Sequence, residues 1–197
     1  MRRSSSFRRF LAVVLYGALA AGASPALALT ETQIAALREA RAGEMRKLIV
    51  HDAAKAPYQA AFDAAEGGKM TMAAYEGRIV LLNFWATWCA PCREEMPALN
   101  ALENTLGGED FAVVTVATGR NSPSGMQRFF EEYGIDALPL HKDPRGMLGR
   151  EAAVIGLPVT VILDRDGREV ARLIGGADWA APEAEAILRQ VIAESGS

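Results

Sequence analysis

The sequence predicts an α/β domain with a central mixed β-sheet and helices on both of its faces. Continuous apolar runs over 79–85, 111–117 and 159–163 are typical of strands that are buried on both sides. Segments with apolar residues at helical spacing alternate with these runs, in the order β-α-β-α-β-α-β-β-α. A turn at 164–167 joins the run over 159–163 to an antiparallel partner over 169–174.

Length and charge indicate the number of domains and the kind of partner. The chain has 197 residues, of which 50% are hydrophobic, enough for one domain with additional segments. The formal net charge is −3, and the only basic run is at the N-terminus. This composition argues against a nucleic acid as partner.

Residues 1–28 have the pattern of an export signal. Arginines precede an apolar run over 10–23, and Ala26 and Ala28 offer a cleavage site. The run is shorter than the roughly 20 residues that a spanning helix needs. We predict cleavage near residue 29, with an uncleaved anchor as the alternative. Either outcome places the remaining chain in a bacterial periplasm, where disulfides persist.

Residues 29–56 predict a helical extension ahead of a main domain over 57–197. Thr30 and Gln33 match a capping box, and apolar residues at helical spacing continue to about Ile49. Gly43 interrupts this pattern. His51 falls just past the predicted helix, where we expect a solvated or capping side chain.

Turn residues and helical spacing define the other elements. Glu66-Gly67-Gly68 predicts a hairpin within 57–71. Ser122-Pro123 begins a helix that ends at Gly134. The remaining predictions are a short strand over 138–141, a short helix over 145–153 and a closing helix over 179–193.

The two cysteines, Cys89 and Cys92, lie where the strand over 79–85 gives way to a helix that ends before Gly107. The N-terminus of a helix favours thiolate over thiol. Cys89 would be the nucleophile, and Cys92, one turn later, would resolve the mixed disulfide. Pro91 suits the first helical turn, where a missing N–H costs little.

Two other interpretations of the pair are a zinc site and a structural disulfide. Zinc needs four ligands, and His51 and His141 are far apart in the sequence. Closing so short a loop would stabilise the fold very little. A Cys-x-x-Cys pair beside a βα pattern indicates redox exchange, with no cofactor besides the disulfide and no bound metal.

The stretch 82–97 (Leu-Asn-Phe-Trp-Ala-Thr-Trp-Cys-Ala-Pro-Cys-Arg-Glu-Glu-Met-Pro) resembles the signature of the exported TlpA/ResA/CcmG group of thioredoxin-fold proteins. Residues 156–160 resemble the loop that carries a cis-proline in that fold, and 123–153 occupy the place of the group's αβ insertion. Residues 175–180 resemble the TlpA branch. The resemblance covers about 69–192 and implies a thioredoxin fold with an N-terminal extension and a central insertion.

The resemblance also implies a substrate-binding surface. A cis bond before Pro158 would leave backbone groups of Leu157 free to pair with an extended client segment. The alternative is a trans proline that begins a strand. Trp88, Ala90 and Pro91 surround the cysteine pair and would complete the docking surface.

Glu95 is the charged residue most suited to a role in exchange. It lies one helical turn beyond Cys92, where a carboxylate could move protons during exchange. The alternative is a solvated first helical turn, which we accept for Glu94. Asn83 stands where thioredoxin has a buried aspartate, and because an amide cannot take up a proton, Glu95 would assume that task.

The sequence therefore predicts a periplasmic thiol–disulfide oxidoreductase that reduces disulfides of specific client proteins. By resemblance, the clients carry cysteine pairs that await haem in apocytochrome c or copper in cytochrome oxidase assembly. A membrane electron donor of the DsbD/CcdA type would regenerate the dithiol. The alternatives are a disulfide oxidase and a Sco-type copper chaperone, for which His141 is the candidate third ligand.

Overall fold

The computed structural model describes residues 30–194; the predicted export segment lies outside the described residues. Strand β4 is central: it runs parallel to β5 and antiparallel to β7 in a mixed sheet of order β1-β8-β7-β4-β5-β6-β2-β3. The strands are β1 (Ile49–Lys55), β2 (Phe62–Asp63), β3 (Lys69–Met70), β4 (Ile79–Trp85), β5 (Phe111–Thr118), β6 (His141–Asp143), β7 (Val159–Leu163) and β8 (Glu169–Ile174).

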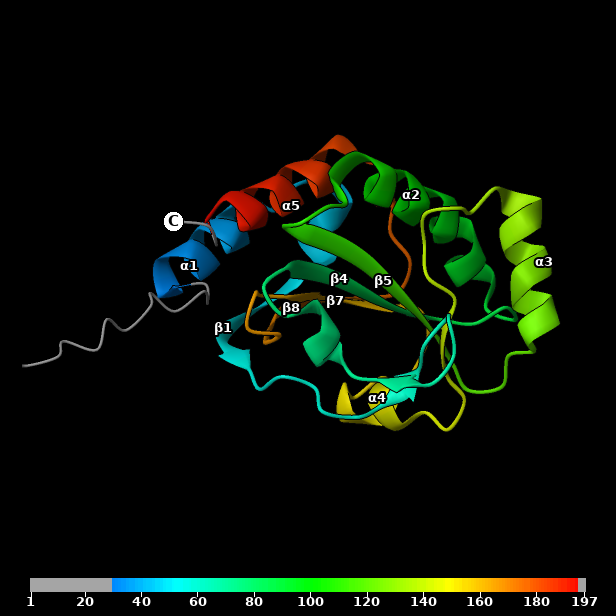
Figure 1. Ribbon diagram of the computed structural model, residues 1–197. Helices are drawn as coiled ribbons and strands as arrows, with labels where there is room; N and C mark the ends of the chain where they lie inside the picture. The colour runs from blue at the N-terminus through cyan, green and yellow to red at the C-terminus, as the bar shows by residue number, and fades with distance from the viewer. Residues whose placement is uncertain (1–29, 195–197) are drawn as a thin grey trace, which may run out of the picture.

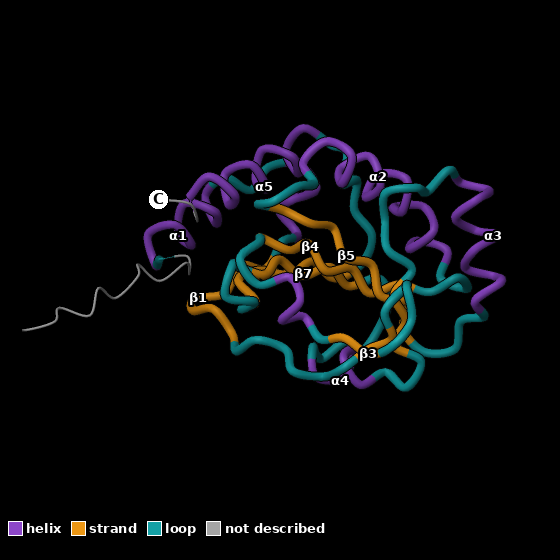
Figure 2. The backbone as a smooth tube through the Cα atoms, in the orientation of Figure 1, coloured by secondary structure: helices purple, strands orange, loops and turns teal. Residues whose placement is uncertain are grey.

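Helices cover both faces of the sheet, as the sequence predicts (Figure 1). Figure 2 shows α1, α2 and α5 along one face and α4 along the other. Among the described residues, no helix is both long and apolar enough to cross a membrane. The helices are α1 (Glu31–Glu39), α2 (Ala90–Leu106), α3 (Pro123–Tyr133), α4 (Met147–Glu151) and α5 (Pro182–Glu194), with short 3-10 helices η1 (Gly43–Lys47) and η2 (Met72–Tyr75).

Side chains of β4 alternate between two apolar cores, which is why this strand reads as a continuous apolar run. Ile79, Leu81 and Trp85 pack on the side of α2 and α5. Val80, Leu82 and Phe84 pack on the side of α4. The predictions for β4, β5, α2, α3, the β7–β8 hairpin and the hairpin within 57–71 are confirmed.

The predicted helix of the N-terminal extension is wrong beyond Glu39. The regular helix ends at Glu39 with Ala40 as its C-cap, and Gly43, with φ +51°, begins a short 3-10 helix. Residues from Ile49 to Lys55 then form β1, an edge strand antiparallel to β8. Its sequence is polar and alanine-rich, so pairing with β8 rather than local propensity makes it a strand.

His51 therefore lies on a strand, and the predicted solvated or capping side chain is wrong. Its Nε2 is 2.6 Å from Oε1 of the fully buried Glu169. Arg172 binds the same carboxylate at 2.5 and 2.6 Å, and Tyr58 donates its hydroxyl to it. Burial raises the pKa of Glu169, but hydrogen bonds from Arg172, Tyr58 and His51 outweigh it and lower the pKa to about 2.

Two further boundaries differ from the sequence prediction. The short strand predicted over 138–141 begins only at His141, where pairing with β5 starts. The closing helix begins at Pro182 rather than at Trp179, because proline fits the first helical turn. Trp179 precedes the helix and is buried in the core beside α5.

Candidate active site

The cysteine pair lies at the junction of β4 and α2, as predicted. Cys89 is the N-cap of α2, Pro91 lies in the first turn, and the two cysteines form a disulfide. The backbone N–H of Cys92 donates to Sγ of Cys89 at 3.3 Å. Cys89 is 6% exposed and Cys92 is fully buried, so Cys89 is the sulfur that a client can reach. Ala90 and Pro91 are exposed beside it.

Glu95 lies in α2 and its side chain is buried, so the alternative of a solvated first helical turn is wrong for this residue. Its side chain is 4% exposed, whereas Glu94 is exposed. Oε1 accepts from Nδ2 of Asn83 at 2.8 Å, and Oε2 accepts from the backbone N–H of Ala177 at 3.2 Å. Burial raises the pKa of Glu95 to about 7, because these two donors only partly offset the lost solvation.

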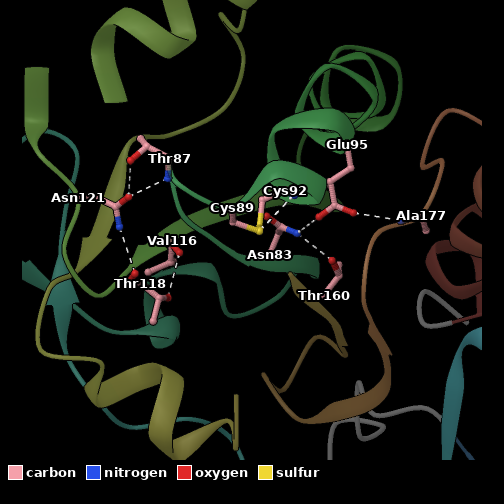
Figure 3. Close-up of a disulfide and its surroundings, with 10 residues drawn as sticks. All are labelled: Asn83, Thr87, Cys89, Cys92, Glu95, Val116, Thr118, Asn121, Thr160 and Ala177. Atoms are coloured by element: carbon pink, nitrogen blue, oxygen red, sulfur yellow. Dashed lines mark hydrogen bonds between the residues drawn. A yellow bond between two sulfur atoms is a disulfide. The ribbon is translucent and has the colours of Figure 1, made fainter. Parts of the chain in front are cut away.

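Asn83 connects Glu95 to the sheet (Figure 3). It is fully buried on β4, opposite Thr160 of β7. Its Nδ2 donates to Oε1 of Glu95 and to Oγ1 of Thr160, each at 2.8 Å. The amide stands where a second carboxylate would be repelled by Glu95, and it stabilises the charged form of Glu95 instead.

A cleft of about 420 Å³ gives Glu95 access to solvent. It opens between α2 and the loop from β8 to α5, and no cationic side chain lines it among the described residues. The lining residues are Glu44, Pro91, Glu94, Glu95, Ala98, Gly176, Ala177 and Asp178.

The predicted cis bond is present between Leu157 and Pro158, so the trans alternative is wrong. Pro158 is buried at the start of β7 and accepts a hydrogen bond from the N–H of Gly175 at 2.9 Å. Leu157 is half-buried, and Ile155 just before it is 98% exposed. Trp88, predicted at the docking surface, is 66% exposed and donates its indole N–H to the carbonyl of Arg120 at 3.2 Å.

Asn121, which the sequence pattern did not single out, holds the loop in front of Cys89. Its Oδ1 accepts from the backbone N–H of Thr87 at 2.8 Å and from the Thr87 hydroxyl at 3.0 Å. Its Nδ2 donates to the carbonyl of Thr118 at the end of β5 (Figure 3). Because β4 and β5 are parallel, the loops that follow them meet at one edge of the sheet, and this order is the signal that could have pointed to Asn121.

Asn121→Ala is expected to slow the reaction of Cys89 with a small disulfide about tenfold, because the loop that presents the thiolate loses two of its restraints. Thiolate absorbance and stopped-flow exchange would measure the effect. Asn100→Ala is a matched control, since Asn100 accepts from two backbone N–H groups, of Asp136 and Ala137, in another loop. A variant that loses stability but keeps the reactivity of Cys89 would show that Asn121 is only structural.

His141 is buried on β6, and both of its ring nitrogens have partners. Nδ1 accepts from the N–H of Ala65 at 2.9 Å, and Nε2 is 2.8 Å from the hydroxyl of Tyr75. Burial lowers the pKa of His141. Both ring nitrogens of His141 are therefore engaged, whereas the copper-chaperone alternative needs one of them as the third copper ligand.

Comparison with known proteins places the chain among thioredoxin-like folds. The model of the AhpC/TSA family matches residues 52–172. The chain is 36% identical over 100 residues to the thiol:disulfide interchange protein HelX of Rhodobacter capsulatus, covering 51% of this chain and 54% of HelX. It is 29% identical over 110 residues to the thiol-disulfide oxidoreductase ResA of Bacillus thuringiensis, covering 56% and 62%. The chain thus spans less than two thirds of these relatives.

A solved structure agrees with this placement. The thiol:disulfide interchange protein described as DsbE from Chlorobium tepidum superposes with a TM-score of 0.59 at 27% identity. The match covers 72% of this chain and 96% of that one. Together with the sheet order, these similarities confirm the predicted thioredoxin fold and the resemblance to the ResA and CcmG types.

Proposed function

The chain belongs to the AhpC/TSA family, and from this premise we propose that it is an exported thiol–disulfide oxidoreductase that reduces disulfides of specific client proteins. One observation carries the proposal: the Cys89–Cys92 disulfide caps a helix one turn ahead of a buried carboxylate with a pKa of about 7. Relatives named for thiol–disulfide interchange support it.

The reaction begins with the reduced dithiol. The Cys89 thiolate attacks one sulfur of a client disulfide, forms a mixed disulfide and releases the first client thiolate. The Cys92 thiol then gives up its proton and attacks Sγ of Cys89, which releases the second client thiolate. Two electrons pass from the dithiol to the client, and the Cys89–Cys92 disulfide reforms. The disulfide itself is the only redox group in this scheme.

Glu95 serves the second step as the proton acceptor for Cys92. A general base works best when its pKa lies near the operating pH, and burial raises the pKa of Glu95 to about 7. Asn83 and the N–H of Ala177 hold the carboxylate in place. The cleft beside Glu95 then lets the proton leave to solvent.

The client would lie across the exposed surface around Cys89. The backbone of Leu157, before the cis bond to Pro158, pairs with an extended client segment, as an added strand does. The exposed indole of Trp88 and the surfaces of Ala90 and Pro91 contact the residues around the client cysteine. These contacts hold the client cysteine next to Cys89, the more accessible of the two sulfurs.

Clients and donor follow from the resemblance to the TlpA, ResA and CcmG types. We propose cysteine pairs of apocytochrome c or of copper-site proteins as clients, and a membrane donor of the DsbD/CcdA type as the source of electrons. The export pattern of residues 1–28 supports a periplasmic location, either free after cleavage or anchored.

Trapping with Cys92→Ala tests the proposal. The variant should hold clients as mixed disulfides through Cys89, and mass spectrometry would identify them. The double variant Cys89→Ala with Cys92→Ala is the control and should trap none. Recovery of no disulfide-linked protein from periplasmic extract would overturn the proposal.

The direction of electron flow is tested by equilibration of the protein with glutathione. A reductant should have a potential near that of thioredoxin, about −270 mV. A value near that of DsbA, about −120 mV, would instead establish the oxidase alternative.

A further inference from the structure

The amide oxygen of Asn83 is a buried acceptor without a partner. Asn83 is fully buried, and its Oδ1 makes no hydrogen bond in the described structure. A buried acceptor left unsatisfied is costly, and such atoms are rare in folded proteins. An unpaired oxygen beside a redox centre therefore calls for an explanation in terms of another state of the protein.

The charge of Glu95 sets the orientation of this amide. When Glu95 is ionised it can only accept hydrogen bonds, and the NH₂ group of Asn83 then faces it. The same NH₂ group also donates to Oγ1 of Thr160. With its nitrogen committed to these two partners, the amide turns its oxygen away from both.

The oxygen lies on the side of the disulfide. Along β4, Ile79, Leu81 and Trp85 face the core that contains Cys89 and Cys92, and the two-residue period of a strand places Asn83 on the same face. Figure 3 shows the amide nitrogen directed to Glu95 and Thr160, and the two sulfurs on the opposite side of the amide.

Reduction of the disulfide creates the missing donor. The S–S bond breaks, and two electrons and two protons convert its sulfurs into two thiols. Cys92 is fully buried, so an acceptor for its new S–H group, a weak donor, can come only from inside the protein. We propose that Oδ1 of Asn83 accepts a hydrogen bond from the Cys92 thiol in the reduced protein, and that this bond favours the dithiol over the disulfide.

This inference rests on the proposed function, because it applies to a disulfide that is reduced during turnover. It adds a chain of contacts, in which Cys92 S–H donates to the oxygen of Asn83 and the nitrogen of Asn83 donates to Glu95. The carboxylate polarises the amide and strengthens its oxygen as an acceptor. Asn83 thus contacts both the resolving thiol and its base; because an amide does not relay a proton, the S–H leaves Oδ1 of Asn83 before its proton passes to Glu95.

Asn83→Ala tests the proposal through the equilibrium with glutathione. Loss of one hydrogen bond that exists only in the dithiol should lower the equilibrium constant for reduction about five- to tenfold, and a tenfold change equals about 30 mV toward more negative potential. The shift should persist in the Glu95→Gln background, where the charge of Glu95 is absent. Thr160→Val, which removes only a partner of the amide nitrogen, should change the constant less than about twofold.

A measurement on the unsubstituted side chain covers the case in which Asn83→Ala does not fold. The ¹³C resonance of the Asn83 side-chain carbonyl should move when the disulfide of the wild type is reduced. In Cys92→Ala, which lacks the donor, this resonance should stay near its position in the disulfide form of the wild type. The carbonyl of Asn121, whose oxygen has partners in the disulfide form, is the internal reference. An Asn83 resonance that does not respond to reduction would overturn the inference.

The two proposals fail in distinguishable ways. If the wild-type protein reduces no client or model disulfide, the proposed function fails. If the wild type cycles normally but Asn83→Ala keeps its potential, only the role of Asn83 fails.

Discussion

Cys89→Ala is expected to lower the rate of disulfide reduction by roughly 10³-fold or more, to the level of uncatalysed exchange. Cys89 is the more accessible of the two sulfurs and caps α2, where the positive end of the helix stabilises a thiolate. Without it, the one remaining cysteine is Cys92, which is fully buried. The rate is measured in a single turnover with the pre-reduced variant and a labelled disulfide peptide.

Cys92→Ala is the matched control for this prediction. It should carry out the first attack at a rate close to that of the wild type and then stop as a mixed disulfide. If instead Cys89→Ala reacted and Cys92→Ala did not, the assignment of nucleophile and resolving thiol would be reversed.

Glu95→Gln is expected to slow resolution of the mixed disulfide about 10²-fold at pH 8, because glutamine cannot accept the proton of Cys92. In the wild type, the rate of resolution should rise with pH through the pKa of Glu95, at about 7. This rise should be absent in the variant. Stopped-flow measurement of resolution between pH 5 and pH 9 would show both effects. Glu94→Gln, at an exposed neighbour, should keep the wild-type profile.

Glu95→Gln, which slows the reaction, should increase the stability of the folded protein above pH 7. The folded pKa of Glu95 lies above its unfolded value of 4.5, so the folded protein binds the proton more tightly. The free energy of unfolding therefore falls as pH rises from about 4.5 to about 7, by about 3 kcal/mol. Glu95→Gln removes this loss and should be more stable than the wild type at pH 8. Equal urea midpoints at pH 8 would contradict the burial argument.

Most of the site could be predicted because it is local in sequence. The apolar run of β4, the cysteine spacing and the position of Glu95 one turn later all lie between residues 79 and 95. Pro158 is distant, and only the resemblance of its loop pointed to a cis bond. In each case the residue type itself carries the chemical signal.

What could not be predicted depends on contacts between distant segments. Asn121 is a polar residue in a loop, and nothing local distinguishes it from a solvated asparagine. Strand β1 has few β-branched residues, and it is a strand because it pairs with β8. His51 was misplaced for the same reason, since its partner Glu169 lies on that distant strand.

The position of β1 also limits where the chain can be cut. Both ends of the sheet are built from the segment 49–70, with β1 beside β8 and the β2–β3 hairpin beside β6. Removing residues up to 56, at the predicted boundary of the main domain, would strip β1 from the sheet. The backbone groups of β8 would then be open to pairing with other molecules, and Glu169 would lose His51. Shortened forms that begin at residue 57 should therefore aggregate, whereas forms that retain β1 should remain dispersed.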